Sequence, residues 1–117
     1  MESIKAHVYN LLDSIEGVDV HFYYPQTFIT LPSISFYENA TVDGASMDNL
    51  VWLKDCIIQI DVWAAKYTQA DSISGQIDAV MHADGWRCQM MSDLPQTDGV
   101  YHRTMRYRKQ ILKKEGI

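Results

Sequence analysis

The sequence predicts an α+β fold: an antiparallel sheet of about five strands with two helices packed on one face, in the order α-β-β-β-α-β-β. Two segments carry apolar residues at offsets of three and four, the spacing of an amphipathic helix. The other segments are rich in β-branched and aromatic residues, and the longest alternates between apolar and polar positions as a half-buried strand does. With 117 residues, the chain fits a single domain, residues 1–117.

The first helix is expected from about Ser3 to Glu16, where the apolar residues fall at helical spacing. These residues are Ile4, Val8, Leu11, Leu12 and Ile15. Ser3 can cap the start of this helix, and Gly17 suits its end.

The next two segments favour strands, over Val18–Pro25 and over Ser33–Asn39. Pro25 ends the first strand, because proline cannot donate a hydrogen bond to a neighbouring strand. The stretch Ala40–Asn49 contains Asp-Gly and several small polar residues, so it is expected to form a loop or a wide hairpin connection.

The third strand is expected over Leu50–Ala64, and the second helix over about Thr68–Ala83. In the strand, Ile58, Ile60 and Val62 share one face, and Gln59, Asp61 and Trp63 share the other. One face is therefore expected to be packed and the other to meet polar surroundings. The helix has an apolar stripe of Ile73, Ile77, Val80 and Met81. Gly85 fits just past its end, and Gly75 within it predicts close approach to a neighbouring strand.

Two further strands are expected over Trp86–Ser92 and Tyr101–Ile111, joined through the hairpin connection Asp93–Val100. In the last strand, Tyr101, Arg103, Met105 and Tyr107 lie on one face, and His102, Thr104, Arg106 and Arg108 on the other. Residues 111–117 are charged and are expected to fray.

The charge of the chain is unevenly distributed. Its net charge is −5, but from Gly99 onward six basic residues face one acid, a net charge of +5. The preceding residues then hold four basic and fourteen acidic groups, a net charge of −10. Such asymmetry suits self-complementary assembly or a polyanionic partner, and equally a solvated basic strand that balances an acidic domain.

No apolar run is long enough to span a membrane and no signal peptide is evident, so the protein is expected to remain in the cytoplasm where it is made.

No catalytic constellation is evident. The sequence has no glycine-rich phosphate loop and no nucleophile elbow, so neither an enzyme nor a cofactor is expected. Asp78 and His82 have metal-ligand spacing on a helix, but a helix-stabilising contact explains them more simply, and no metal is expected. Cys56 and Cys88 are expected to be reduced thiols. Asp55 and Asp61 on the long strand, with Asp43 and Asp48 in the nearby loop, could act as paired acids only within a cleft, so they are expected to be solvated charges.

Several segments together resemble a known family. They are Leu31–Glu38 (LPSISFYE), Cys56–Ala64 (CIIQIDVWA), Ile77–Met81 (IDAVM) with the Gly85-Trp86 exit, and Tyr101–Tyr107 (YHRTMRY). Over residues 4–111 the chain resembles the tail-terminator, or tail-completion, proteins that join heads to tails in long-tailed phages and prophages. The resembling motifs are short and structural, and none of them marks a catalytic site.

The resemblance implies a structural virion protein at the head-proximal end of the tail, assembled in the host cytoplasm. It implies a homo-oligomeric ring, commonly a hexamer, that caps the tail tube and offers a docking surface to the head connector. The implied partners are further copies of itself, the tail-tube protein and the connector or neck protein. DNA would pass through the lumen without specific binding. A head-completion or neck protein, or a small non-enzymatic nucleic-acid-associated binding module, remains an alternative.

Two sets of residues are candidates for these contacts. Arg103, Arg106 and Arg108 are hypothesised to pair with Asp55 or Asp61 of an adjacent subunit, because the basic end of the chain complements its acidic body. The polar connections are hypothesised to project toward tail and head proteins. Their candidate contact residues are Val42, Asp43, Gly44, Met47, Asp48, Gln96 and Asp98.

Overall fold

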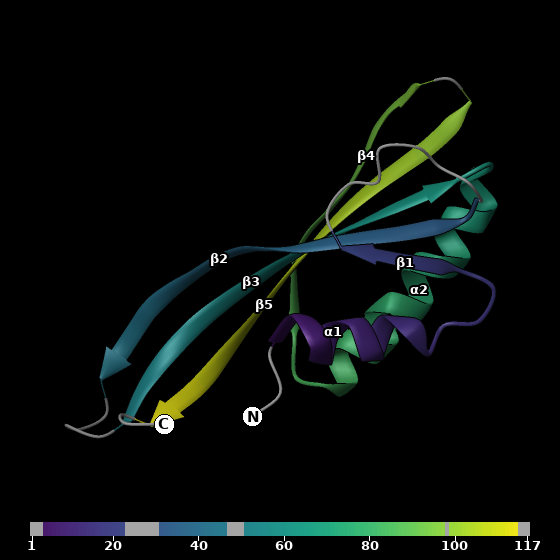
Figure 1. Cartoon of the computed structure of the whole chain (residues 1–117). Coiled ribbons are helices and arrows are strands. Elements are labelled where there is room, and N and C mark those ends of the chain that lie inside the picture. The colour runs from purple at the N-terminus through teal and green to yellow at the C-terminus, as the bar shows by residue number, and fades with distance from the viewer. Residues whose placement is uncertain (1–3, 23–30, 47–50, 98, 115–117) are drawn as a thin grey trace.

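The computed structural model describes residues 4–22, 31–46, 51–97 and 99–114, with side chains described for 4–22, 31–39, 54–95 and 99–111. The α+β class and the predicted element order are confirmed (Figure 1). The elements are α1 (Ile4–Asp13), β1 (Asp19–Phe22), β2 (Ser33–Ser46), β3 (Val51–Ala64), α2 (Tyr67–Ala83), β4 (Arg87–Thr97) and β5 (Val100–Lys114). Neither described helix has the length and hydropathy that crossing a membrane requires.

The five strands form one sheet in the order β1-β2-β3-β5-β4. The pairs β2–β3, β3–β5 and β5–β4 are antiparallel, as predicted. The short edge strand β1 differs, because it runs parallel to β2, from Asp19 opposite Ser33 to Phe22 opposite Phe36. The sheet is therefore mixed, and β5 lies inside it although it follows all the other elements in the chain.

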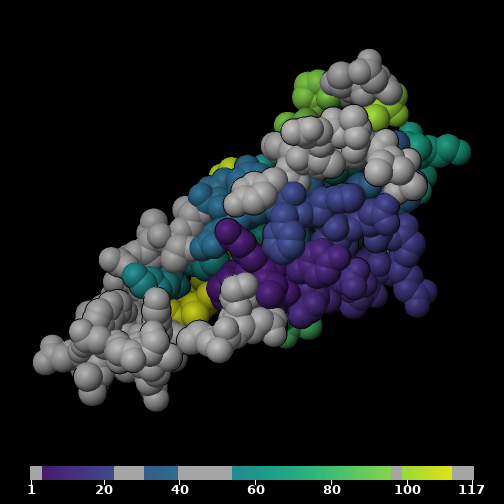
Figure 2. All heavy atoms as spheres, in the orientation of Figure 1, coloured from purple at the N-terminus to yellow at the C-terminus, as the bar shows by residue number. Residues whose placement is uncertain are grey.

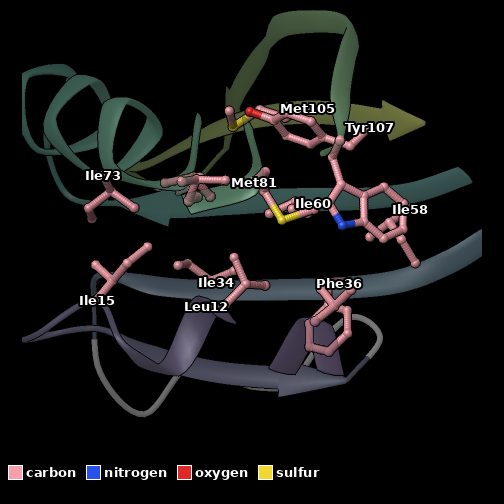
Figure 3. Close-up of a cluster of buried hydrophobic side chains, with 14 of the residues drawn as sticks. Leu12, Ile15, Ile34, Phe36, Ile58, Ile60, Ile73, Met81, Met105 and Tyr107 are labelled. Carbon is pink, nitrogen blue, oxygen red and sulfur yellow. The ribbon is translucent and has the colours of Figure 1, made fainter. Parts of the chain in front are cut away.

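Both helices cover one face of the sheet, where they enclose the hydrophobic core (Figure 3). The predicted alternation of β3 is confirmed, because Ile58, Ile60 and Val62 are fully buried beneath the helices. The helices contribute Val8, Leu12, Ile73, Ile77 and Met81, and the neighbouring strands contribute Ile34, Phe36, Met105 and Tyr107. Figure 2 shows α1 and β1, in purple and blue, forming one continuous surface beside β2.

Three strands extend the sheet beyond the helices, which makes the molecule long, at 52 × 25 × 24 Å. The strands β2 and β3 have 14 residues each and β5 has 15. At about 3.3 Å per residue, a strand of this length spans about 46 Å. We call the extension the arm: residues 39–46 of β2, 51–57 of β3 and 109–114 of β5. Figure 1 shows it leaving the helical part of the molecule at lower left.

The arm contains residues that the sequence predicted to be a loop. Residues 40–46 continue β2, paired with β3 from Ala40 opposite Ile57 to Ser46 opposite Trp52. The register shifts between Glu38 and Ala40, and again between Asp43 and Ser46, so the strand accommodates its small polar residues through irregularities. The predicted loop is therefore wrong over these residues, while 47–50 lie outside the described part.

The connection between the last two strands is also shorter than predicted. The strand β4 continues through Thr97, which pairs with Val100, so most of the predicted connection Asp93–Val100 is strand. Gly99 has a φ of 75°, a left-handed conformation that glycine adopts without strain. At the other end, β5 reaches Lys114, three residues beyond the predicted Ile111. The prediction for Gly75 is wrong, because no described neighbour lies within 4 Å of the position its Cβ would take.

Candidate interaction surface

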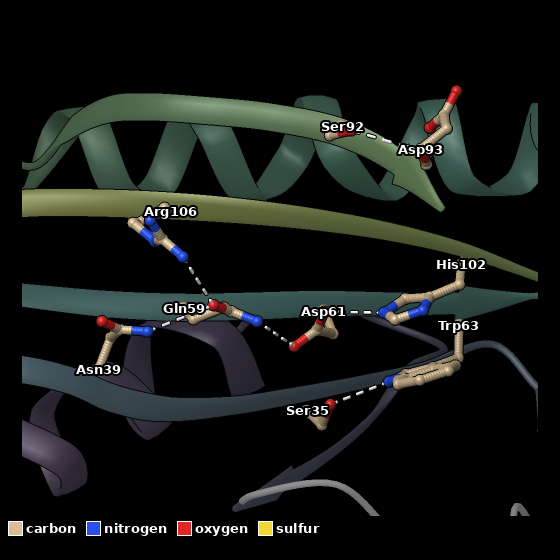
Figure 4. Close-up of polar contacts among 9 residues, drawn as sticks. All are labelled: Ser35, Asn39, Gln59, Asp61, Trp63, Ser92, Asp93, His102 and Arg106. Carbon is tan, nitrogen blue, oxygen red and sulfur yellow. Dashed lines mark hydrogen bonds and ion pairs between the residues drawn. The ribbon is translucent and has the colours of Figure 1, made fainter. Parts of the chain in front are cut away.

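The face of the sheet opposite the helices carries a polar network (Figure 4). Asp61 Oδ1 lies 2.7 Å from His102 Nε2, and Gln59 donates to Asp61 Oδ2 over 3.4 Å. The His102 ring stacks on Trp63 with centroids 3.7 Å apart, and the Trp63 indole N–H donates to Ser35 Oγ over 2.9 Å. The network joins β2, β3 and β5 across the sheet, because these residues occupy neighbouring register positions on one face.

Asp61 is fully buried, so the expectation that this acid is solvated is wrong. Gln59 is 8% exposed, and the His102 side chain is 13% exposed. A buried carboxylate requires hydrogen-bond donors, and Asp61 obtains them from Gln59 and His102. Strand alternation predicted the face of Asp61 correctly but not its burial. Asp61 is therefore part of the fold and is not presented on the surface.

Arg103 lies on the helix-covered face, where it ties α2 to β4. Its guanidinium contacts Asp93 at 2.7 Å, Asp71 at 2.8 Å and Ser74 Oγ at 3.0 Å. The hydrogen bond with Asp93 is the main cause of a raised pKa for Arg103, and it lowers the pKa of Asp93. The structure therefore separates Arg103 from Arg106 and Arg108, which lie on the opposite face, as the predicted alternation requires.

Arg106 and Arg108 lie on the helix-free face beside β3. Arg106 donates to Gln59 Oε1 over 3.3 Å, while its buried Nε has no hydrogen-bond partner among the described residues. Arg108 pairs with Asp55 of the same chain at 2.7 Å, and its side chain is 48% exposed. Asp55 is 13% exposed, and its second oxygen, Oδ1, is buried without a described partner. Asp55 and Arg106 thus each keep one buried polar atom without a partner among the described residues.

A groove of about 590 Å³ lies where β4 begins beside β5. It is lined by Asp55, Gly85, Arg87, Cys88, Gln89, Arg108, Lys109 and Gln110. Arg87 pairs directly opposite Arg108 in the β4–β5 register. Like charges in directly opposed positions repel, and Asp55, which also lines the groove, offsets part of this repulsion through its ion pair with Arg108. The sequence alone does not single out Arg87 or Lys109, because their proximity depends on the register of two strands.

Asp84, at the end of α2, connects three parts of the fold. Its Oδ2 lies 2.8 Å from His7 Nε2 in α1, and it accepts hydrogen bonds from the Trp86 indole at 3.0 Å and from Lys109 in β5 at 3.3 Å. Burial alone would raise the pKa of Asp84. The hydrogen bonds from these three residues, with the positive charge of Lys109, outweigh burial and hold the pKa below its ordinary value of 3.8. The ionised carboxylate therefore stabilises the folded state.

We expect Asp84→Asn to weaken the acid dependence of stability. A folded-state pKa below the unfolded value stabilises the protein above the unfolded pKa, near 3.8, and this stabilisation is lost as the pH falls through the folded pKa. Urea unfolding at several pH values from 2 to 6 should give a shallower acid limb for the variant than for the parent. The matched control is Asp13→Asn on the exposed side of α1, which should retain the parent's acid limb. Identical acid limbs for Asp84→Asn and the parent would contradict this assignment.

The predicted contact residues of the connections lie partly in strands. Val42, Asp43 and Gly44 belong to β2, and Gln96 belongs to β4. Met47, Asp48 and Asp98 lie outside the described residues. Four of these seven candidate residues therefore lie on strands. Their contacts with tail or head proteins stay predictions.

The described residues contain no group of three or more potential metal-ligating His, Cys, Asp or Glu side chains. The pair Asp78 and His82 is within 3.1 Å, and Asp78 also accepts a hydrogen bond from the Tyr107 hydroxyl at 2.7 Å. Burial, and then this hydrogen bond, raise the pKa of Tyr107. Cys56 is buried and Cys88 partly buried, and both are free thiols. The contacts of Asp78 therefore join α2 to β5 and stabilise α2 itself.

Comparison with solved structures gives two informative similarities. A chain from the virion of a native gene transfer agent particle superposes with a TM-score of 0.64 at 15% sequence identity, covering 95% of this chain and 96% of that one. The gp17 protein of bacteriophage SPP1 superposes with a TM-score of 0.56 at 14% identity, covering 92% and 87% of the two chains. No protein-family model and no curated protein sequence matches this chain. The fold is thus shared along nearly the whole length of both chains.

Proposed function

We propose that this protein is a structural virion component of a long-tailed phage or prophage, which forms a ring at the head-proximal end of the tail. The ring caps the tail tube and provides the docking surface for the head connector. The observation that carries the proposal is the fold shared with a chain of the gene transfer agent virion, which spans 95% of this chain and 96% of that one. The similarity to SPP1 gp17 supports it, together with the resemblance in sequence to tail-completion proteins.

The shape of the molecule is consistent with assembly into a larger structure. A monomer of this size is usually compact, whereas this chain extends an arm of three strands away from its helices. No described helix covers this part of the sheet, which leaves it available for packing against another subunit. We propose that the subunits contact one another head to tail, because such contacts close into a ring when the rotation between subunits permits. The ring has no enzymatic role in this proposal, and DNA passes through its lumen without specific binding.

The structure narrows the set of arginine and aspartate residues that we propose to contact an adjacent subunit. Arg103 and Asp61 already have partners within the fold, at 2.7 Å each, from Asp93 and His102. Arg106, Arg108 and Asp55 lie on the helix-free face, and Arg108 is half exposed. Arg108 also pairs with Asp55 of the same chain, at 2.7 Å, but its side chain is 48% exposed, so we propose Arg108 as the member of the set with most access to a neighbouring subunit. Rim ion pairs of this kind contribute about 0–1 kcal/mol each, so their effect would be on register more than on affinity.

The proposal predicts the mass of the protein in solution. Light scattering after size exclusion, with and without tail tubes purified from the same particle, should give a ring of several 13.5 kDa subunits or a monomer that becomes a ring on tube ends. Tubes sheared to create additional ends are the matched control, because binding should increase with the number of ends and not with tube length.

A stable monomer or dimer that ignores tube ends would contradict the proposal. Salt-dependent binding of DNA by that species would then favour the nucleic-acid-associated module, since phosphate contacts weaken steeply as salt rises. A ring that binds heads without tubes would favour a head-completion or neck protein.

A further inference from the structure

The arm has an open strand edge on each of its two sides. On one side, the pairing of β1 with β2 ends at Phe36, so β2 from Asn39 to Ser46 has no outer strand among the described residues. On the other side, the pairing of β4 with β5 ends at Arg87 and Arg108, so Lys109–Lys114 has none in the described part of the chain. Open edges present rows of backbone N–H and C=O groups that can pair with another strand.

The other edges of the sheet carry features that prevent such pairing. The outer strand β4 has two register irregularities, Pro95 and the charged Asp93. The outer strand β1 is only four residues long. Irregularities, proline, charge and short length are means by which proteins protect sheet edges. The β2 edge is regular only over Ala40–Asp43, and the lysines of the β5 edge disfavour pairing with a second β5 edge but not with an acidic one. The β5 edge has no such irregularity, because its pairing with β3 is continuous from Tyr101 to Lys114.

The directions of the strands determine how two copies can join. Both β2 and β5 run antiparallel to β3, so they are parallel to each other on opposite sides of the arm. A rotation about an axis along the arm keeps every strand direction, and it can place β5 of one copy beside β2 of the next in a parallel pair. Each copy then offers one edge and accepts another, which is the head-to-tail contact that closes a ring.

The charges of the two edges favour this pairing over the alternatives. The edge Lys109–Lys114 carries three lysines and no acid, and the edge Asn39–Ser46 carries one acid, Asp43, and no base. A two-fold dimer through β5 would bring six lysines together, and like charges across a strand pair are destabilising. Pairing β5 with β2 instead joins edges of opposite charge.

We propose that Lys109–Lys114 of one copy pairs in parallel with the regular part of β2, Ala40–Asp43, of the next copy. The arms then form one closed barrel around the centre of the ring, and no open edge remains. The proposal rests on the ring of the proposed function and assigns the surface through which its subunits join. The occupant of the β5 edge is a second copy of this chain.

Cysteine pairs across the two edges test the proposal. Val42 and Gln110 both lie opposite Asp55 in the arm, on either side of it. Within one chain they are therefore separated by two strand spacings, about 10 Å, beyond the roughly 7 Å between Cα atoms that a disulfide can bridge. Assembled rings of Val42→Cys/Gln110→Cys should give, on oxidation, a ladder of covalent oligomers up to the ring size, which a reductant collapses to monomer. Placing the first cysteine at position 41 or 43 instead of 42, again with Gln110→Cys, tests a register of the two paired edges that differs by one residue.

The controls separate the failure of this inference from the failure of the proposed function. The parent chain, with Cys56 and Cys88, measures background cross-linking. Ser92→Cys/Gln110→Cys is the matched pair, because Ser92 is exposed on β4, outside the proposed interface. Rings that form but cross-link through none of the three edge pairs overturn the inference and leave the ring intact. Absence of rings from the parent, even on tube ends, overturns the proposed function and the inference with it.

A charge reversal supplies a second measurement that does not depend on cysteine. Lys113→Glu/Lys114→Glu should reduce ring assembly at low salt at least tenfold, and adding Asp43→Lys should restore part of it. Assembly unaffected by the reversal would also overturn the proposed pairing. Thermal unfolding of each variant monomer shows whether the fold is retained.

Discussion

Replacing Phe36 by alanine should lower the free energy of unfolding by about 3–5 kcal/mol, the usual cost of removing a buried phenylalanine ring. Phe36 is fully buried on the helix-covered face, in the part of the core next to the edge strand β1. Its ring lies 4.9 Å from that of Phe22 and 6.5 Å from that of Tyr9, so it joins β2 to β1 and α1. Its loss leaves a cavity that three elements border. Urea unfolding measures the change in free energy, and thermal unfolding should show a fall of roughly 10–20 °C in Tm.

The neighbouring ring supplies the matched control for this prediction. Phe22 undergoes the same chemical change on Phe22→Ala, but its side chain is 46% exposed and it stacks on Tyr9 at the surface. It therefore loses less buried area, and the expected cost is roughly 1–2 kcal/mol. Equal losses of stability for Phe36→Ala and Phe22→Ala would contradict the burial of Phe36 and the exposure of Phe22.

The second large effect is expected from Asp61→Ala, which should destabilise the fold by about 2–4 kcal/mol. The substitution leaves the donors of His102 and Gln59 without their acceptor on a buried face, and each buried unsatisfied group costs about 1–3 kcal/mol. Asp61→Asn should cost less, because its amide oxygen can still accept one of these hydrogen bonds. Chemical unfolding of both variants gives the comparison.

Asp71→Ala is the control for the substitution of an aspartate. Asp71 pairs with Arg103 at the surface and is 57% exposed, so its removal should cost about 0–1 kcal/mol. If Asp61→Ala is no more harmful than Asp71→Ala, the polar network does not stabilise the fold.

The periodicity of the sequence predicted the elements and the core because both depend on local spacing. The stripe of Ile73, Ile77 and Met81 identified the buried side of α2, and strict alternation identified the buried side of β3. Neither pattern encodes strand direction, so the parallel pairing of β1 with β2 was not predictable from it. The strand at residues 40–46 was missed for a different reason. Its Asp, Gly and Ser residues disfavour a strand, and pairing with β3 overrides that local preference.

The candidate surface was less predictable, because it is made by residues far apart in the chain. Asp55 and Arg108 are separated by 53 positions, and Asp61 and His102 by 41. The presence of opposite charges in a sequence does not show whether an ion pair forms within one subunit or between two subunits. From the sequence a pair between subunits was predicted, whereas the structure shows Arg108 paired with Asp55 within one chain. The register of β3 with β5 decides this, and register is a property of the whole sheet.

The position of β5 within the sheet has a consequence for biosynthesis. It follows every other described element in the chain, yet it separates β3 from β4. As the chain leaves the ribosome, β4 has no strand to pair with, and β3 exposes the edge that β5 will occupy. Pairing between strands distant in sequence is slow, and nascent chains with exposed edges aggregate readily. The sheet can close only after translation of β5, so a product that stops before Val100 would leave β3 open and be a substrate for chaperones and proteases.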